Sequence, residues 1–234
     1  MNPIILAVDV PSESEAKKLI ETVGNRVGTY KIGSELFTKC GPEIVKSVRA
    51  TGAQVFLDLK FYDIPNTVSK AIAAAAALDV QMLTIHVSGG RQMMENALKS
   101  SQESAIGSPP LVLGVTVLTS FNQAQLSETG LSLDIDKQVL LLAKLAVDSG
   151  LKGLVCSPLE IETLRKNIPN DVKLVTPGIR PPSASSDDQK RIMSPEEALR
   201  LGADYLVIGR PIYAAPNPAE AAENIYNSIQ DFCD

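Results

Sequence analysis

Charged residues end successive apolar segments of this chain, at positions where packing gives no reason for a charge. Lys31 ends one segment, Asp58 and Lys60 end the next, and Asp63 follows shortly after Lys60. Side chains alternate across a strand, so Asp58 and Lys60 are expected to point the same way, about two residue rises apart. The signs of these four charges alternate, which lets buried charges neutralise one another. The pattern predicts a charged array in a dry site; the alternative is an ion-pair network that only closes one end of the fold.

The array favours acid chemistry at a lysine. A lysine held between carboxylates stays protonated, whereas a Schiff-base nucleophile needs a neutral amine. Such a cation can stabilise a carbanion that develops beside it and then protonate it. A fixed carboxylate nearby would disfavour a substrate carboxylate that is about to leave. The sequence carries no cysteine–histidine pairing, no G-x-S-x-G turn and no dinucleotide-binding loop that would indicate other chemistry.

A second group of residues predicts an anion site. The segment TPGIR brings Pro177 and Arg180, and Gly209 is followed at once by Arg210. Glycines let backbone N–H groups approach an anion, and an arginine can grip phosphate oxygens through two parallel hydrogen bonds. Gln189 lies in a polar segment that could reach the same anion. The alternative for each arginine is an ordinary surface charge.

The elements that must position these residues alternate between strands and helices. Strands are expected near 3–9, 28–33, 54–60, 80–87, 111–118, 152–156, 172–177 and 204–209. Helices are expected near 12–24, 34–51, 64–78, 90–104, 134–149, 158–167, 194–201 and 217–232. The strands are almost continuously apolar, as parallel strands buried on both faces are. Eight such units predict an α/β fold, a (β/α)8 TIM barrel formed by residues 1–234 as a single domain. A doubly wound open sheet is the alternative, but no G-x-G-x-x-G follows the first strand.

A barrel collects its functional groups at the carboxyl ends of its strands, where two long connections also lie. Asp9, His86 and Thr119 end further strands. Residues 119–133 follow the fifth strand, and residues 179–193, rich in serine and proline, follow the seventh. Long connections without apolar periodicity are typical of lids, so 179–193 is expected to be a mobile loop that closes over the phosphate; an inert loop is the alternative.

Composition excludes several classes of function. Hydrophobic residues make up 44% of the chain and charged residues 21%, as in ordinary globular proteins. The net charge of −5 argues against nucleic-acid binding, which needs a basic surface. No signal peptide or membrane span is expected. Cys40, Cys156 and Cys233 lie too far apart to indicate a disulfide framework or a zinc site, which favours the cytoplasm. His86 is the single histidine, which excludes a histidine-rich metal centre.

The segment DLKFYDIPNT, residues 58–67, fits the pattern D-x-K-x-x-D-I-x-x-T. It resembles the signature of the orotidine 5′-phosphate decarboxylase family. The resemblance extends along essentially the whole chain, through YKIG, IHVSGG, VLTS and TPGIRP. It implies binding of orotidine 5′-phosphate and UMP by Asp9, Lys31, Asp58, Ile64, Thr67, His86, Thr119, Ser120, Pro177, Arg180, Gln189, Gly209 and Arg210.

The resemblance also implies the roles of the charged array. Lys60 would protonate C6 of the pyrimidine as carbon dioxide leaves, in the last step of UMP synthesis. Asp58 would lie beside the departing carboxylate, and Lys31 and Asp63 would complete the array. Asp63, Ile64 and Thr67 would serve the neighbouring subunit's site, so the active unit would be a cytoplasmic homodimer that needs neither metal nor cofactor.

Two other functions remain open at this point. A 3-keto-gulonate 6-phosphate decarboxylase-like enzyme shares D-x-K-x-x-D but needs magnesium; those relatives carry an acidic metal ligand where this chain has Lys31, whose ammonium would repel the ion. A catalytically silent phosphate-binding regulator would be marked by loss of Lys60 or Asp58, and both are present.

Overall fold

Parallel strands close into a barrel in the computed structural model, which describes residues 2–181 and 192–233. The strands are β1 (Ile4–Ala7), β2 (Thr29–Gly33), β3 (Gln54–Phe61), β4 (Met82–His86), β5 (Leu111–Val115), β6 (Gly153–Val155), β7 (Lys173–Thr176) and β8 (Tyr205–Ile208). Each strand pairs with the next in the sequence, and β8 returns to β1 with Leu206 opposite Ile4. The predicted (β/α)8 barrel is therefore confirmed, and the open-sheet alternative is wrong.

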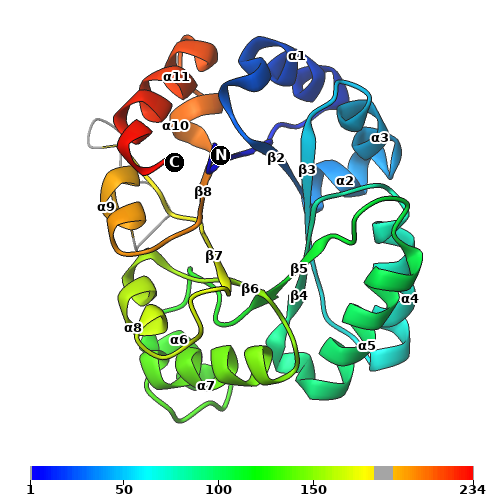
Figure 1. Ribbon diagram of the computed structural model, residues 1–234, viewed down its shortest axis with the longest axis vertical. Coiled ribbons are helices and arrows are strands. Elements are labelled where there is room, and N and C mark those ends of the chain that lie inside the picture. Colours follow the sequence, from blue (N-terminus) through cyan, green and yellow to red (C-terminus); the bar gives the residue numbers. More distant parts are fainter. Residues whose placement is uncertain (1, 182–191, 234) are drawn as a thin grey trace.

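Helices surround the ring of strands (Figure 1). They are α1 (Glu13–Val23), α2 (Ser34–Cys40), α3 (Glu43–Arg49), α4 (Pro65–Ala76), α5 (Gly90–Ser104), α6 (Gln123–Glu128), α7 (Ile135–Asp148), α8 (Ile161–Arg165), α9 (Pro195–Arg200), α10 (Arg210–Tyr213) and α11 (Pro218–Ser228). Short 3-10 turns occupy Gly24–Arg26, Val87–Gly89, Pro158–Glu160 and Gln230–Phe232. None of the helices within the described ranges has the length and apolar character to cross a bilayer.

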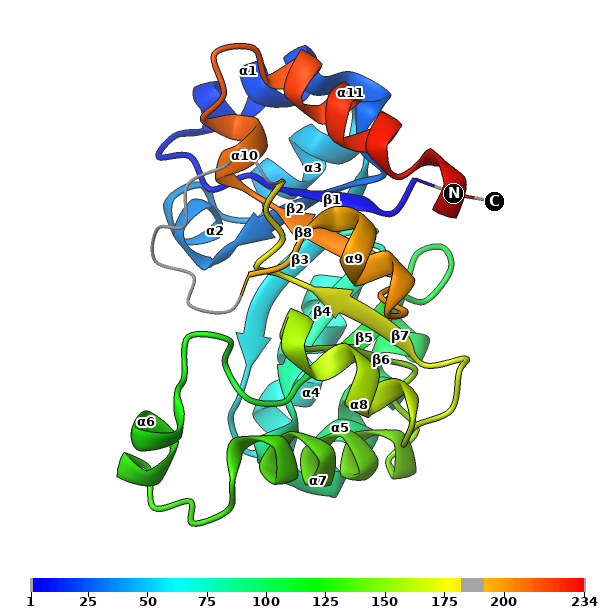
Figure 2. The same cartoon turned by 90° about the vertical axis from the view of Figure 1, so that its left-hand side faces the viewer.

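Two expectations about the helices were wrong. The single helix expected over 34–51 is broken at Gly41, whose φ of +66° ends α2, and Pro42 then precedes α3. The connection 119–133 contains α6, which begins with a capping box between Asn122 and Gln125. Helix α6 stands away from the barrel, as Figure 2 shows.

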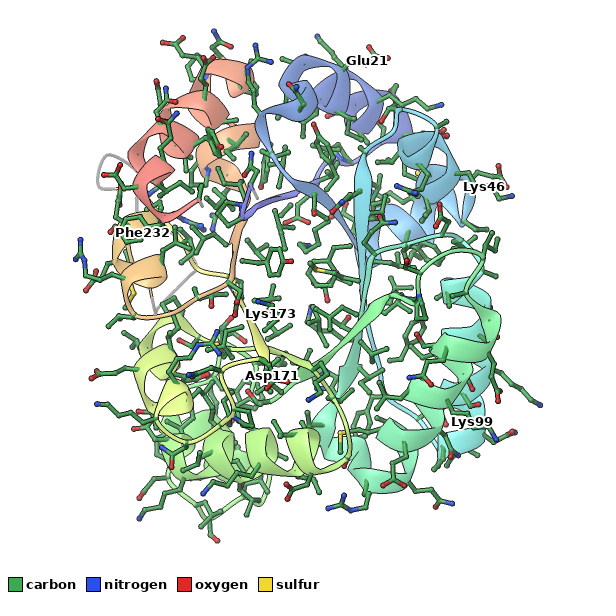
Figure 3. The ribbon with its side chains drawn as sticks, in the orientation of Figure 1. Glu21, Lys46, Lys99, Asp171, Lys173 and Phe232 are labelled. Carbon is green, nitrogen blue, oxygen red and sulfur yellow. The ribbon has the colours of Figure 1, made fainter. Side chains whose placement is uncertain are left out.

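Apolar side chains fill both the inside of the barrel and the layer between strands and helices. The inner cluster consists of Ile5, Ala7, Phe56, Met82, Leu113, Val175 and Val207. Figure 3 shows side chains filling the ring of strands, so the barrel is a packed core and not a pore. Because the strands are buried on both faces, they show no polar alternation until their carboxyl ends.

The two ends of the connection 179–193 lie together. Ile179 pairs with Met193, and the Arg180 N–H donates to the Met193 carbonyl at 3.0 Å. Most of the expected lid, including Gln189, lies outside the described residues.

Candidate active site

A cavity of about 390 Å³ opens at the carboxyl ends of the strands. Nine of the predicted site residues line it, namely Asp9, Lys31, Asp58, Lys60, Thr119, Pro177, Arg180, Gly209 and Arg210. They come from strands or loops all around the barrel, so only closure of the sheet brings them together. The expectation that strand ends converge on one site holds for these residues.

The floor of the cavity is apolar. Phe56, Val115, Val155 and Val207 line it, and Phe56 and Val207 belong to the inner cluster of the barrel. A ligand seated on this floor would lie between an apolar surface and the charged groups around it. Low polarity beneath the array strengthens electrostatic interactions there, because fewer dipoles screen them.

Three of the four predicted array residues form a connected set of charges. Lys60 Nζ lies 2.8 Å from Asp58 Oδ1 and 2.9 Å from Asp58 Oδ2. Lys31 Nζ lies 3.7 Å from Asp58 Oδ2 and 3.3 Å from Asp9 Oδ1, which adds Asp9 to the set. The side chains of Lys31 and Asp58 are each only 12% exposed, whereas that of Lys60 is 35% exposed and faces the cavity.

Asp58 remains ionised in this setting. Burial raises the pKa of its carboxyl, but the charges of Lys60 and Lys31 and hydrogen bonds from Lys60 and Thr84 outweigh burial, so the pKa lies below the ordinary value of 3.8. Both oxygens of the ionised Asp58 carboxylate accept hydrogen bonds from Lys60 Nζ, so Asp58 holds this amino group at the surface of the cavity.

Strand alternation is not what brings Lys60 to Asp58. Lys60 has a φ of +50°, in the left-handed region that side chains rarely adopt. The pairing of β3 with β4 shifts register between Leu57 and Phe61, so the backbone bulges at the two charged residues. The expectation that Asp58 and Lys60 face the same site is correct, but its geometric reason was wrong.

Glycine at position 33 permits the approach of Lys31 to Asp9. A Cβ there would lie 3.2 Å from Lys31 Nζ and 3.5 Å from Asp9 Oδ1. The first distance is tighter than real Cβ atoms usually make and the second is an ordinary van der Waals contact, so a side chain at position 33 would crowd the Lys31 ammonium. Gly33 was not singled out from the sequence, although it ends the YKIG segment.

The segments that follow β7 and β8 carry the predicted anion-binding residues. Arg180 is buried, and its Nη1 donates to the Ile179 carbonyl at 2.9 Å. Gly209 and Arg210 follow β8, and Tyr213 of α10 completes this side. Arg180, Gly209 and Arg210 form a cationic end of the cavity, and Gly209 lies close to Asp9 because β8 pairs with β1. Tyr213 was missed because a tyrosine three residues after an arginine carries no signal of its own.

The remaining predicted residues lie outside this cavity. Asp63, Ile64 and Thr67 follow β3 and are exposed. Asp63 Oδ1 accepts a hydrogen bond from the Ile64 N–H. Ser120 is also exposed. His86 packs against the Tyr62 ring with centroids 5.6 Å apart, and burial together with the charge of Lys60 lowers its pKa below 6.5.

Potential metal ligands do not converge in the described part of the chain. No group of three or more histidine, cysteine, aspartate or glutamate side chains there could hold a metal ion. Lys31 stands between Asp9 and Asp58, so an ammonium already lies between the two carboxylates.

Comparison with known proteins gives one family. The model of the orotidine 5′-phosphate decarboxylase / HUMPS family matches residues 2–225. An orotidine 5′-phosphate decarboxylase of Opitutus terrae is 52% identical over 97% of this chain and 98% of its own, and one of Citrifermentans bemidjiense is 47% identical over 97% and 95%. A crystal structure of orotidine 5′-phosphate decarboxylase from Lactobacillus acidophilus superposes with a TM-score of 0.88 at 37% identity, covering 97% of this chain and 98% of that one.

Proposed function

The chain belongs to the orotidine 5′-phosphate decarboxylase / HUMPS family and decarboxylates orotidine 5′-phosphate in pyrimidine biosynthesis, and we propose that Lys60 supplies the proton that replaces carbon dioxide. One observation carries the assignment of Lys60: its ammonium, held by both oxygens of a buried Asp58, faces a cavity with an apolar floor. The product is UMP.

The chemical step balances without a cofactor. The bond between C6 and the substrate carboxylate breaks, carbon dioxide leaves, and the bonding electron pair stays on C6. The Lys60 ammonium stabilises this developing carbanion and transfers one proton to it, which leaves a neutral amine that solvent reprotonates. Asp58 lies next to the departing carboxylate in this arrangement, and its negative charge favours the loss of that charge as carbon dioxide.

The rest of the substrate spans the cavity. Arg180, Gly209 and Arg210 would hold the 5′-phosphate, because the cationic end offers guanidinium donors and accessible backbone. Asp9 and Lys31 would hold ribose hydroxyls, and Thr119, which lines the same cavity, would contact the pyrimidine. Pro177 would pack beside the phosphate. The cationic end and the array line one cavity, which suits a nucleotide that carries both a phosphate and a base.

We also infer a homodimer with shared sites. Tyr62 and Ile64, which are separated by one residue, are 62% and 65% exposed, and exposed apolar groups close together are typical of an interaction surface. Asp63 and Thr67 lie in the same exposed stretch, directly after the array. A second copy packed on this stretch would bury the apolar pair and receive Asp63 and Thr67 at its own cavity.

The cytoplasm is the compartment that we propose. Cys40, Cys156 and Cys233 are all free thiols, which suits a reducing environment.

A direct assay tests the activity. We expect the purified protein to consume orotidine 5′-phosphate, with loss of its absorbance and release of UMP, and to keep its rate in EDTA. The control is 3-keto-gulonate 6-phosphate with and without Mg²⁺, which should not react. Turnover of that sugar phosphate with Mg²⁺ and none of orotidine 5′-phosphate would contradict the assignment.

A further inference from the structure

Thr84 lies at the place where β3 and β4 lose their regular register. Leu57 pairs with Leu83 and Phe61 pairs with Ile85, so between these pairs β3 advances by four residues and β4 by two. Thr84 is the β4 residue opposite the bulge that contains Asp58 and Lys60. Its side chain is completely buried, and sequence reasoning gave it no role.

The Thr84 hydroxyl forms hydrogen bonds with both Lys60 and Asp58. The Lys60 backbone N–H donates to Thr84 Oγ1 at 2.8 Å, and Thr84 Oγ1 donates to Asp58 Oδ1 at 2.9 Å. A hydroxyl has one proton to donate and lone pairs to accept, so both bonds can exist at once. The hydroxyl thus takes the place of a carbonyl that would accept the Lys60 N–H in a regular ladder.

We propose that Thr84 is a positioning residue that holds the left-handed backbone of Lys60 and the carboxylate of Asp58 in register, so that the ammonium is placed for proton transfer. The inference rests on the proposed role of Lys60. A left-handed lysine is strained and persists only where its surroundings fix it. Without the hydroxyl, a buried N–H would lose its acceptor and Asp58 would lose a donor. Relaxation of φ would then rotate the Cα–Cβ bond of Lys60 and turn the ammonium away from Asp58.

Two substitutions separate the hydroxyl from the volume of the side chain. Thr84→Val keeps the shape and removes both hydrogen bonds, whereas Thr84→Ser keeps the hydroxyl and removes a methyl group. We expect Thr84→Val to lower kcat by about tenfold or more, with KM and the dissociation constant of UMP within about threefold of wild type. Thr84→Ser should keep kcat within about threefold.

Thr176→Val is the matched control. Thr176 is also fully buried near the carboxyl end of a strand, but within residues 2–181 and 192–233 its hydroxyl bonds to the Cys156 sulfur, at 3.7 Å, and to no charged group. We expect both kcat and KM of this variant within about twofold of wild type. Hydrogen exchange of the Lys60 amide, measured by NMR, should accelerate in Thr84→Val and stay slow in Thr84→Ser and Thr176→Val.

The outcomes distinguish this inference from the proposed function. Full kcat in Thr84→Val, or a loss in Thr84→Ser as large as in Thr84→Val, would overturn the role of Thr84 while leaving the decarboxylase intact. An equal loss of kcat in Thr176→Val would also overturn it, since any buried threonine would then serve. A wild-type protein that does not decarboxylate orotidine 5′-phosphate would instead refute the proposed function.

Discussion

Removing the ammonium of Lys60 separates the chemistry of the cavity from its binding of nucleotide. We expect Lys60→Ala to lose decarboxylation by more than about a thousandfold, because it removes the ammonium that faces the cavity, whereas the other ammonium near Asp58, that of Lys31, is only 12% exposed and is also paired with Asp9. Binding of UMP should persist, because the amine acts chiefly on a carbanion that the product lacks. Steady-state kinetics and calorimetry with UMP measure the two effects.

Lys99→Ala is the control for this change. Lys99 lies on α5 at the periphery of the molecule, with its side chain 73% exposed (Figure 3). Its loss should alter neither quantity. If Lys60→Ala retains activity within about tenfold, which corresponds to about 1.4 kcal/mol, Lys60 is not the proton donor.

Arg210 gives a second prediction at the scale of a residue. If its guanidinium holds the 5′-phosphate, Arg210→Ala should lower kcat/KM for orotidine 5′-phosphate by about a hundredfold, or about 2.7 kcal/mol. The same variant should react with orotidine, which lacks the phosphate, as slowly as wild type does. An equal loss with both substrates would show that Arg210 acts by some route other than the phosphate. Exposed Arg200 provides the matched substitution.

Among the elements, the strands could be predicted from the sequence, but the backbone conformation of Lys60 at the end of β3 could not. Burial on both faces makes each strand an apolar run, and a closed parallel barrel then places every strand end at one mouth. That rule was enough to predict that Asp9, Lys31, Asp58 and Lys60 lie close together. The left-handed φ of Lys60 was out of reach, because it depends on Thr84 of the neighbouring strand and not on any local sequence preference.

The helix errors have local causes that the sequence contains. Gly41-Pro42 is a dipeptide that ends helices, and it divides the expected helix 34–51. Asn122 and Gln125 have the spacing of a capping box, which marks the start of α6. Asp63, Ile64 and Thr67 lie outside the cavity of their own chain. Their proposed role depends on a second chain, which the sequence of one chain does not place.

Helix α5 carries a prediction about stability. Ser101 Oγ is the one buried side-chain oxygen in the described residues without a hydrogen-bond partner. Ser101→Ala should raise the free energy of unfolding by about 1 kcal/mol, because it removes an unsatisfied hydroxyl and improves helix propensity. Denaturant unfolding at fixed protein concentration measures the change.

The neighbouring Ser100 is its control. Ser100 Oγ lies 2.6 Å from Ser69 Oγ on α4, so Ser100→Ala breaks a hydrogen bond that joins two helices. It should be less stable than Ser101→Ala in the same assay. The opposite order would mean that Ser101 has a partner in solution, for instance a buried water.

At the scale of the whole molecule, the cavity of one chain lacks one member of the predicted array. Asp63 follows Lys60 closely in sequence, yet its side chain is exposed, and its carboxylate accepts a hydrogen bond from the Ile64 N–H at 2.6 Å. The exposed Tyr62 and Ile64 beside it are the surface that a second copy would cover. Under two-fold symmetry each subunit would then give Asp63 and receive it.

Mixing two inactive variants tests this exchange. Lys60→Ala and Asp63→Ala are prepared as separate dimers and then allowed to exchange subunits. In a hybrid dimer one site carries both substitutions, while the other combines an intact Lys60 with an intact Asp63. Random exchange makes about half of the dimers hybrids, so about a quarter of all sites should regain wild-type activity. If Asp63 serves its own chain, every site carries one lesion and mixing restores nothing. Exchange shown by mass spectrometry without recovery of activity would therefore refute the shared site, while the decarboxylase activity of the wild type would stand.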